Sequence, residues 1–265
     1  MHVRPISLGF ATLNMGLLLA ANSLYAQTVD LPPRTQEGTS WTLGTAVLSV
    51  PRYFGADSNR ILVLPAITAR SQEGWFITGR GDAGWNFSKD DQLEYGAMIS
   101  PQLPRNESAD PALRGMGDIK LHAELGGFVN YSPVRALRLQ AAVRAGSGND
   151  QKGVILSLAA GTAYPVAESM LLAGSVGLAF ANQAYAQSFF GVNSAQSASS
   201  GYAVYQPRAG LADVNAGLAL LGQFSPQWTY AVGVNAARLL GDFKNSPLTK
   251  NATQVAFFSG VSYKF

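Results

Sequence analysis

The sequence predicts an all-β protein, a transmembrane antiparallel β-barrel of the outer-membrane type. Three observations support this prediction. After residue 40 the chain consists of short segments in which apolar and polar side chains alternate, as they do along a strand with two different faces. Only 13% of the residues are charged, compared with roughly 25% in an average soluble protein. The chain also ends on an aromatic strand without a polar tail.

The closing segment, residues 253–265, is the clearest of these strands. One face carries Val261, Tyr263 and Phe265, and the other carries small or charged residues together with Phe258. In an outer-membrane barrel the last strand closes the cylinder, and aromatic residues near its end lie in the interfacial girdle. We therefore predict that Val261, Tyr263 and Phe265 form a carboxy-terminal barrel-assembly signal.

The amino-terminal residues 1–26 have the pattern of a secretory signal. Arg4 provides the charged end, an apolar core follows, and a cleavage motif ends at Ala26. A retained membrane anchor is the alternative. We predict cleavage after Ala26, export to the cell outer membrane, a periplasmic lead-in over residues 27–40 and a barrel over residues 41–265.

Eleven alternating segments separated by turn residues follow the lead-in. They are residues 41–50, 61–70, 75–87, 93–100, 119–126, 137–144, 153–164, 169–181, 208–224, 228–239 and 253–265. Trp75 and Trp85 lie near opposite ends of one segment, as two interfacial girdles would place them. Because single-chain bacterial barrels use an even number of strands, we predict twelve strands, with ten as the alternative.

Charged side chains on the polar faces of these segments need a hydrated interior or close pairing. The predicted lumen-facing polar residues are Arg80, Asp82, Glu94, Lys120, His122, Glu124, Arg138 and Arg144. A barrel of ten to twelve strands lies between small barrels filled by side chains and open porins. These residues could therefore line a narrow channel for small charged solutes.

Other function classes find little support in the sequence. Residues 79–84 match a phosphate-binding glycine motif, but no helix follows them, and Arg80 and Asp82 are better explained as a lumenal pair. His122 and Glu124 could orient a general base, yet no nucleophile accompanies them. With no cysteine there is no thiolate metal site, and the net charge of +3 contains no basic run that would indicate nucleic-acid binding. We predict no enzymatic activity, no metal site and no cofactor.

Several short motifs in a fixed order resemble the MipA/OmpV family of outer-membrane proteins, the MltA-interacting type. They are residues 51–53 with Gly55, residues 113–118, Tyr185 with residues 189–192, residues 240–242 with 246–247, and the Tyr-x-Phe ending. The resemblance implies an outer-membrane barrel. For the best-known member type it implies a scaffold that joins a lytic transglycosylase to a penicillin-binding murein synthase, and it supplies no catalytic residues.

Together these observations lead us to expect a monomeric barrel in contact with outer-membrane lipid and lipopolysaccharide. We expect a structural or scaffolding role in murein synthesis. A channel for small charged solutes and an adhesin that uses residues 183–207 are the alternatives. A scaffold would have to make its contact through residues 27–40 and short turns such as residues 225–227, which is a small surface for a stable interface.

Overall fold

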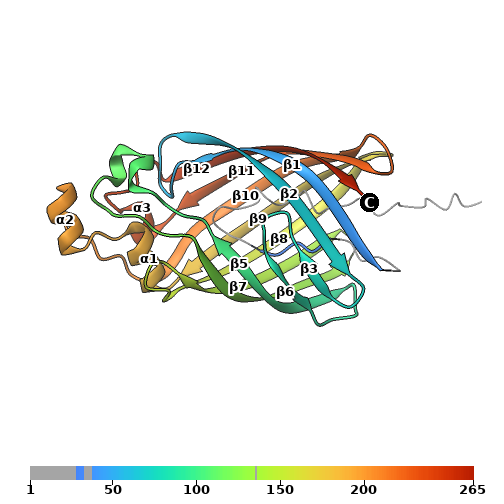
Figure 1. The fold of residues 1–265 in the computed structure, drawn as a ribbon, viewed down its shortest axis with the longest axis horizontal. Helices are drawn as coiled ribbons and strands as arrows, with labels where there is room; N and C mark the ends of the chain where they lie inside the picture. Colours follow the sequence, from blue (N-terminus) through green and yellow to red (C-terminus); the bar gives the residue numbers. More distant parts are fainter. Residues whose placement is uncertain (1–27, 33–37, 135) are drawn as a thin grey trace, which may run out of the picture.

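A computed structural model describes residues 28–32, 38–134 and 136–265, so the predicted signal segment lies outside the described residues. Within this part, twelve antiparallel strands follow one another around a closed barrel, and β12 pairs with β1 to complete the cylinder (Figure 1). This confirms the predicted fold class and the strand number of twelve. Among the described residues, no helix combines the length and hydropathy needed to span a bilayer.

The elements alternate with turns that are short at one end of the barrel and longer at the other. The strands are β1 (Thr39–Pro51), β2 (Asn59–Ser71), β3 (Trp75–Ile77), β4 (Ala83–Asn86), β5 (Leu93–Gln102), β6 (His122–Val134), β7 (Leu137–Ser147), β8 (Gly153–Ala167), β9 (Met170–Ala181), β10 (Gly210–Gln223), β11 (Trp228–Leu239) and β12 (Thr253–Lys264). The helices are the 3₁₀ turns η2 (Glu107–Ala109) and η3 (Pro111–Leu113), and α1 (Gln183–Phe190), α2 (Ser194–Ser200) and α3 (Gly241–Lys244).

Successive side chains of β12 point in turn to the lumen and to the lipid. Ala256 and Phe258 are buried on the lumenal face, whereas Phe257 and Val261 are exposed on the outer face. Tyr263 packs against the ring of Trp228 on β11. Phe265, the third residue of the predicted assembly signal, is exposed and contacts Tyr263. That these residues guide assembly stays a prediction.

The strand predicted over residues 75–87 is in fact two strands. β3 and β4 form a hairpin whose turn is closed by hydrogen bonds from the Gly81 N–H to the Thr78 carbonyl and from the Thr78 N–H to the Asp82 carbonyl. Gly81 has a φ of +91°, which glycine adopts without steric cost. Trp75 and Trp85 are cross-strand partners at one end of the barrel. The interpretation of two girdles on one strand was therefore wrong, and the hairpin supplies the twelfth strand.

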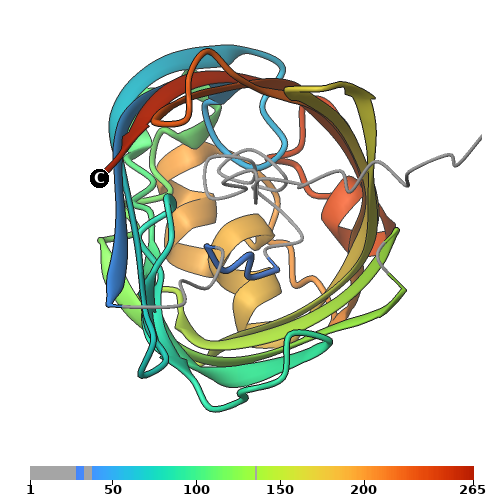
Figure 2. The same ribbon diagram turned by 90° about the vertical axis from the view of Figure 1, so that its right-hand side faces the viewer.

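The amino-terminal part of the described chain lies inside the barrel. Figure 2 looks along the barrel and shows Thr28–Pro32 surrounded by the strands. Val29 packs in a buried cluster with Phe76, Met98 and Phe128. The Val29 carbonyl accepts a hydrogen bond from the Asn130 side chain at 3.0 Å. Of the residues predicted as a periplasmic lead-in, 28–32 thus lie within the lumen, and the last two, 39 and 40, begin β1.

The opposite end of the lumen is covered by α1. The Asn182 side chain caps this helix by accepting a hydrogen bond from the Tyr185 N–H at 2.8 Å. Tyr185, Phe189 and Phe190 are buried in one cluster with Phe243 of α3. Because both termini of outer-membrane barrels face the periplasm, the helices lie at the extracellular end (Figure 1).

A close approach between neighbouring strands provides a test of the packing. Gly233 of β11 lies opposite Phe258 of β12, and a Cβ at this position would contact the Phe258 ring and lie 2.7 Å from the Leu218 carbonyl oxygen. Gly233→Ala should therefore overpack the wall and lower the free energy of unfolding by about 1–3 kcal/mol. Urea titration followed by the heat-dependent shift in gel mobility measures this loss.

The matched control is Gly174→Ala in β9, where a Cβ would come no closer than 3.9 Å to a neighbouring atom. We expect this variant to unfold at the urea concentration of the wild type. Equal destabilisation of the two variants would contradict the packing of Gly233 against Phe258.

Candidate functional site

One buried ion cluster joins strands β2, β5 and β7. The Glu94 carboxylate accepts hydrogen bonds from Arg70 at 2.7 Å and from Arg138 at 2.8 Å. Arg138 also lies 3.5 Å from Asp30 of the lumenal segment, and Arg70 donates a hydrogen bond to the Pro32 carbonyl. Glu94 and Arg138 are in the predicted lumen-facing set, whereas Arg70 is not. This cluster compensates buried charge and holds the lumenal segment in place.

A second ion cluster surrounds Asp82, at the turn between β3 and β4. Arg80 pairs with the Asp82 carboxylate at 3.1 Å, and Arg144 lies 4.0 Å from it. Arg144 is fully buried and donates a hydrogen bond through Nε to Ser100. The structure thus brings Arg80, Asp82 and Arg144, all in the predicted lumen-facing set, into one group.

The remaining predicted residues, Glu124, His122 and Lys120, have different surroundings. Glu124 is buried and accepts a hydrogen bond from Ser147. His122 is half-buried at the start of β6, and its Nε2 has no hydrogen-bond partner among the described residues. Lys120 is exposed and precedes β6. The described part of the chain contains no group of three or more histidine, aspartate or glutamate residues placed to hold a metal ion.

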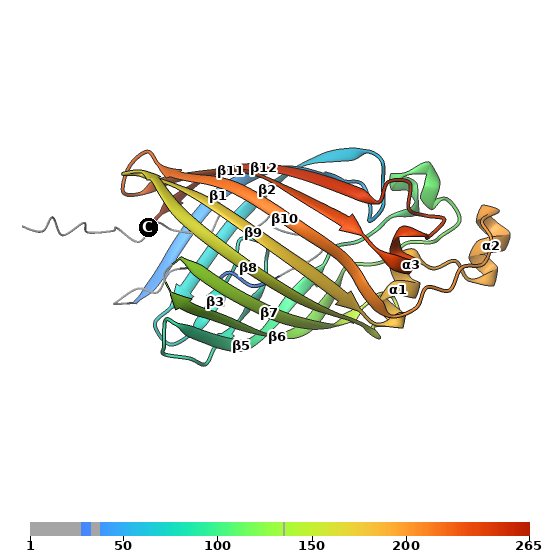
Figure 3. The same cartoon turned by 180° about the vertical axis from the view of Figure 1, so that it is seen from behind.

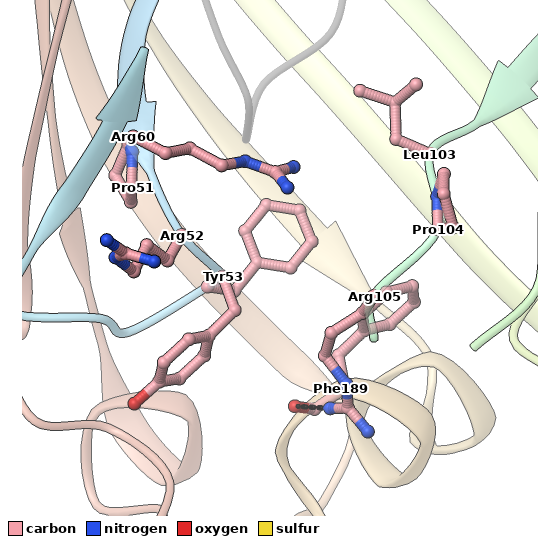
Figure 4. Close-up of a pocket in the computed structure, with 9 residues that line it drawn as sticks. Pro51, Arg52, Tyr53, Arg60, Leu103, Pro104, Arg105 and Phe189 are labelled. Atoms are coloured by element: carbon pink, nitrogen blue, oxygen red, sulfur yellow. Dashed lines mark hydrogen bonds between the residues drawn. The ribbon is translucent and has the colours of Figure 1, made fainter. Parts of the chain in front are cut away.

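A different group of charged residues lines a pocket of about 70 Å³ at the extracellular end. Three arginines, Arg52, Arg60 and Arg105, contribute to its lining, which contains no acidic residue. In Figure 4, Arg60 extends from the start of β2 across the pocket, and Arg105 lies on the opposite side beside Phe189. We call this site the arginine pocket.

The positive charge of the arginine pocket is only weakly compensated. Arg105 donates one hydrogen bond to the Phe189 carbonyl at 3.1 Å, and burial lowers the pKa of its guanidinium to about 10, so it still carries its charge at neutral pH. The Nε atoms of Arg60 and Arg105 are buried without a hydrogen-bond partner among the described residues. Arg52 donates to the Ala109 carbonyl. Guanidinium groups with free donors, in a pocket whose lining holds no carboxylate, favour an anionic ligand.

Sequence reasoning missed all three of these arginines. Arg60 has the same parity as the lumenal face of β2, since it pairs with buried Val50 of β1. The alternation along β2 could therefore have identified Arg60 as a lumenal residue. Arg52 and Arg105 lie in connecting segments without periodicity. Only closure of the barrel brings these segments together.

Comparison with known proteins places the chain in a family and a fold. The family model described as MltA-interacting protein MipA matches residues 43–265. A sequence search among curated proteins found no match.

Among solved structures, the NanC porin is 10% identical in sequence with a TM-score of 0.50, and the match covers 84% of this chain and all of that one. The KdgM porin is 9% identical with a TM-score of 0.39, and the match covers 86% of this chain and 99% of that one. At such identities the NanC match shows likeness of fold alone. The family match, which spans nearly the whole barrel, confirms the resemblance seen in the sequence motifs, and the chain therefore belongs to the MipA family of outer-membrane β-barrel proteins.

Proposed function

We propose that this protein binds small anionic solutes at the extracellular end and conducts them across the outer membrane as a narrow, gated channel. The arginine pocket is the observation that carries the proposal. Three arginines line it without an acidic neighbour in the lining. A site lined by one sign of charge concentrates ligands of the opposite sign. The channel needs no enzymatic chemistry and no cofactor, and it works as a monomer in contact with lipid and lipopolysaccharide.

The gate of the proposed channel is the segment inside the lumen, of which residues 28–32 are described. Residues 28–32 occupy the barrel interior, and α1 covers its extracellular end. The segment is held by side chains of the wall, with Gln140 donating to Asp30 at 2.8 Å and Asn130 donating to the Val29 carbonyl. Displacement of this segment would open the periplasmic half of the lumen.

Planar-bilayer recordings test the anion preference. Under a KCl gradient we expect small conductance steps with a reversal potential that favours chloride over potassium. The double variant Arg60→Gln, Arg105→Gln should shift the reversal potential toward potassium, because it removes two cations from the entrance. The control is Arg114→Gln, an exposed loop arginine outside the pocket. Electrically silent membranes, or steps selective for potassium, would argue against the channel.

The gate has its own test. Asn130→Ala with Gln140→Ala removes hydrogen bonds that hold the lumenal segment, so the open probability should rise several-fold in the same recordings. Asn235→Ala is the control, because this buried amide on β11 makes no hydrogen bond to the described part of the segment. An unchanged open probability in the double variant would contradict gating by residues 28–32.

A scaffold role in murein synthesis is the second candidate, and the description of the family as MltA-interacting favours it. Such a contact with a lytic transglycosylase, or with a penicillin-binding murein synthase, would use the periplasmic turns, including residues 225–227. The lead-in contributes less than the sequence suggested, because residues 28–32 are inside the barrel. An adhesin would rely mainly on α2, since α1 is packed into the barrel mouth.

Cross-linking in envelope extracts tests the scaffold. The wild-type barrel should capture the transglycosylase. A variant with residues 225–227 replaced by Gly-Asn-Gly should capture at least several-fold less at equal barrel abundance. The same replacement tested in bilayers should leave anion selectivity unchanged. Failure of the wild type to retain either murein enzyme would remove this candidate.

A further inference from the structure

The barrel wall is incomplete between β2 and β5. β2 pairs with β1 from Asn59 to Ser71, but β3 pairs with it only at Ala69 and Arg70. β4 reaches β5 no further than Ile99. The β3–β4 hairpin therefore covers only the periplasmic part of this side (Figure 1), whereas β8, β9 and β10 pair along nearly their whole length on the opposite side (Figure 3).

The two strand edges at this opening carry prolines. Pro65 of β2 and Pro101 of β5 both line the opening, and proline has no N–H that would need a partner. Other backbone groups along the edges still require hydrogen bonds, because hydrocarbon supplies none. Lipid therefore cannot be the only molecule at the opening. Polar atoms of water or of a ligand must also reach it.

A cavity of about 460 Å³ lies at this place, and its lining comes from both faces of the wall. Its lining includes Leu48 and Leu62, which pair across β1 and β2 on the lumenal face, and also Ile67, which is exposed on the outer face. Leu64 pairs with buried Ala46 and so belongs to the lumenal face, yet it is 40% exposed because it borders the cavity. Residues from both faces can line one cavity only where the wall is open.

The described lining of the cavity is mainly apolar, and one of its cations is available to bind a ligand. Arg80 and Asp82 at its periplasmic end pair with each other. Arg60 at its extracellular end has no ion pair among the described residues and lines both this cavity and the arginine pocket. The volume lies in the range of about 300–1,000 Å³ that is typical of sites for one small ligand. A chain with a single anionic head matches this combination.

We propose that the ligand of the arginine pocket is a single-chain carboxylate amphiphile that enters laterally from the membrane between β2 and β5. Its carboxylate binds Arg60, and its hydrocarbon chain occupies the cavity against Leu48, Leu62 and Ala256. This inference rests on the proposed anion binding at the same pocket and adds the class of ligand and its route. Water displaced from the apolar lining favours binding of the chain.

Photolabelling of the full-length protein in phosphatidylcholine vesicles tests the route. The probe is hexadecanoic acid with a diazirine near the end of its chain, and mass spectrometry maps the labelled residues. We expect labels on lumen-facing Leu48, Leu62 or Ala256 in addition to lipid-facing residues such as Val176. Arg60→Gln should reduce the lumenal labels on the order of tenfold, as expected for loss of one charge-assisted hydrogen bond.

The controls distinguish the effect of ligand charge from that of protein folding and from the entry route. Arg114→Gln should label as the wild type does, and an unchanged Val176 label in Arg60→Gln shows that this variant is inserted in the bilayer. The methyl ester of the probe, used with the wild-type protein, removes the negative charge without a mutation and should give equally reduced lumenal labels. Labels confined to lipid-facing residues would overturn lateral entry, and equal lumenal labelling by acid and ester would overturn the carboxylate requirement.

The same variants distinguish this inference from the proposed channel. If Arg60→Gln with Arg105→Gln shifts the reversal potential but the acid never labels lumenal residues, small anions use the pocket and the lateral route is wrong. If neither the reversal potential nor the labelling depends on Arg60, both proposals are wrong. Lumenal labelling that depends on Arg60, in a barrel without anion-selective conductance, would support the amphiphile site and contradict the channel.

Discussion

Backbone hydrogen bonding in a medium without water is the constraint on which this structure depends. Each strand in the bilayer must satisfy its N–H and C=O groups through neighbouring strands, so the sheet has to close on itself. Closure is made by β12, which pairs with β1 from Ser49 to Thr42 and with β11 on its other side. Among the described strands, a long interruption lies beside β3 and β4, where Pro65 and Pro101 reduce the number of unpaired donors. Because unpaired strand edges are costly in hydrocarbon, we attribute this interruption in the wall to function.

Charge is distributed unequally in the interior. In the periplasmic part of β2, β5 and β7 the arginines are matched by a carboxylate, in the group of Arg70, Glu94 and Arg138. On the side of β1, β10, β11 and β12, the lumenal face contains an apolar cluster that includes Leu48, Leu221 and Phe258. Most lumens of outer-membrane barrels are polar. This apolar cluster adjoins the opening in the wall, and the guanidinium groups of the arginine pocket lie just beyond it at the extracellular end.

The two ends of the lumen are closed in different ways. Aromatic packing of α1 against α3 covers the extracellular end, with Phe190 and Phe243 in edge-to-face contact at 5.1 Å. The interior near β3 to β7 is filled by a short segment held through its backbone carbonyls by Arg70 and Asn130. Residues 28–32 are held by hydrogen bonds, by the contact of Asp30 with Arg138 and by packing of Val29 and Leu31, whereas α1 is held mainly by packed aromatic rings. The gating test removes some of the polar contacts of residues 28–32.

The sequence by itself determined the fold class and most of the strands, because alternation with period two is a local property, and its short motifs indicated the family. The faces of β12 can be assigned from residues 253–265 without any tertiary information. The hairpin of β3 and β4 could not be separated from a single strand, since glycines at 79 and 81 fit a strand or a turn equally well until neighbours choose between them. Only the tertiary structure decided the placement of residues 28–32, whose partners lie far along the chain, and the arginine pocket, which Arg60 and Arg105 line together because the barrel closes. Contacts between distant segments depend on the path of the whole chain, and no local pattern encodes them.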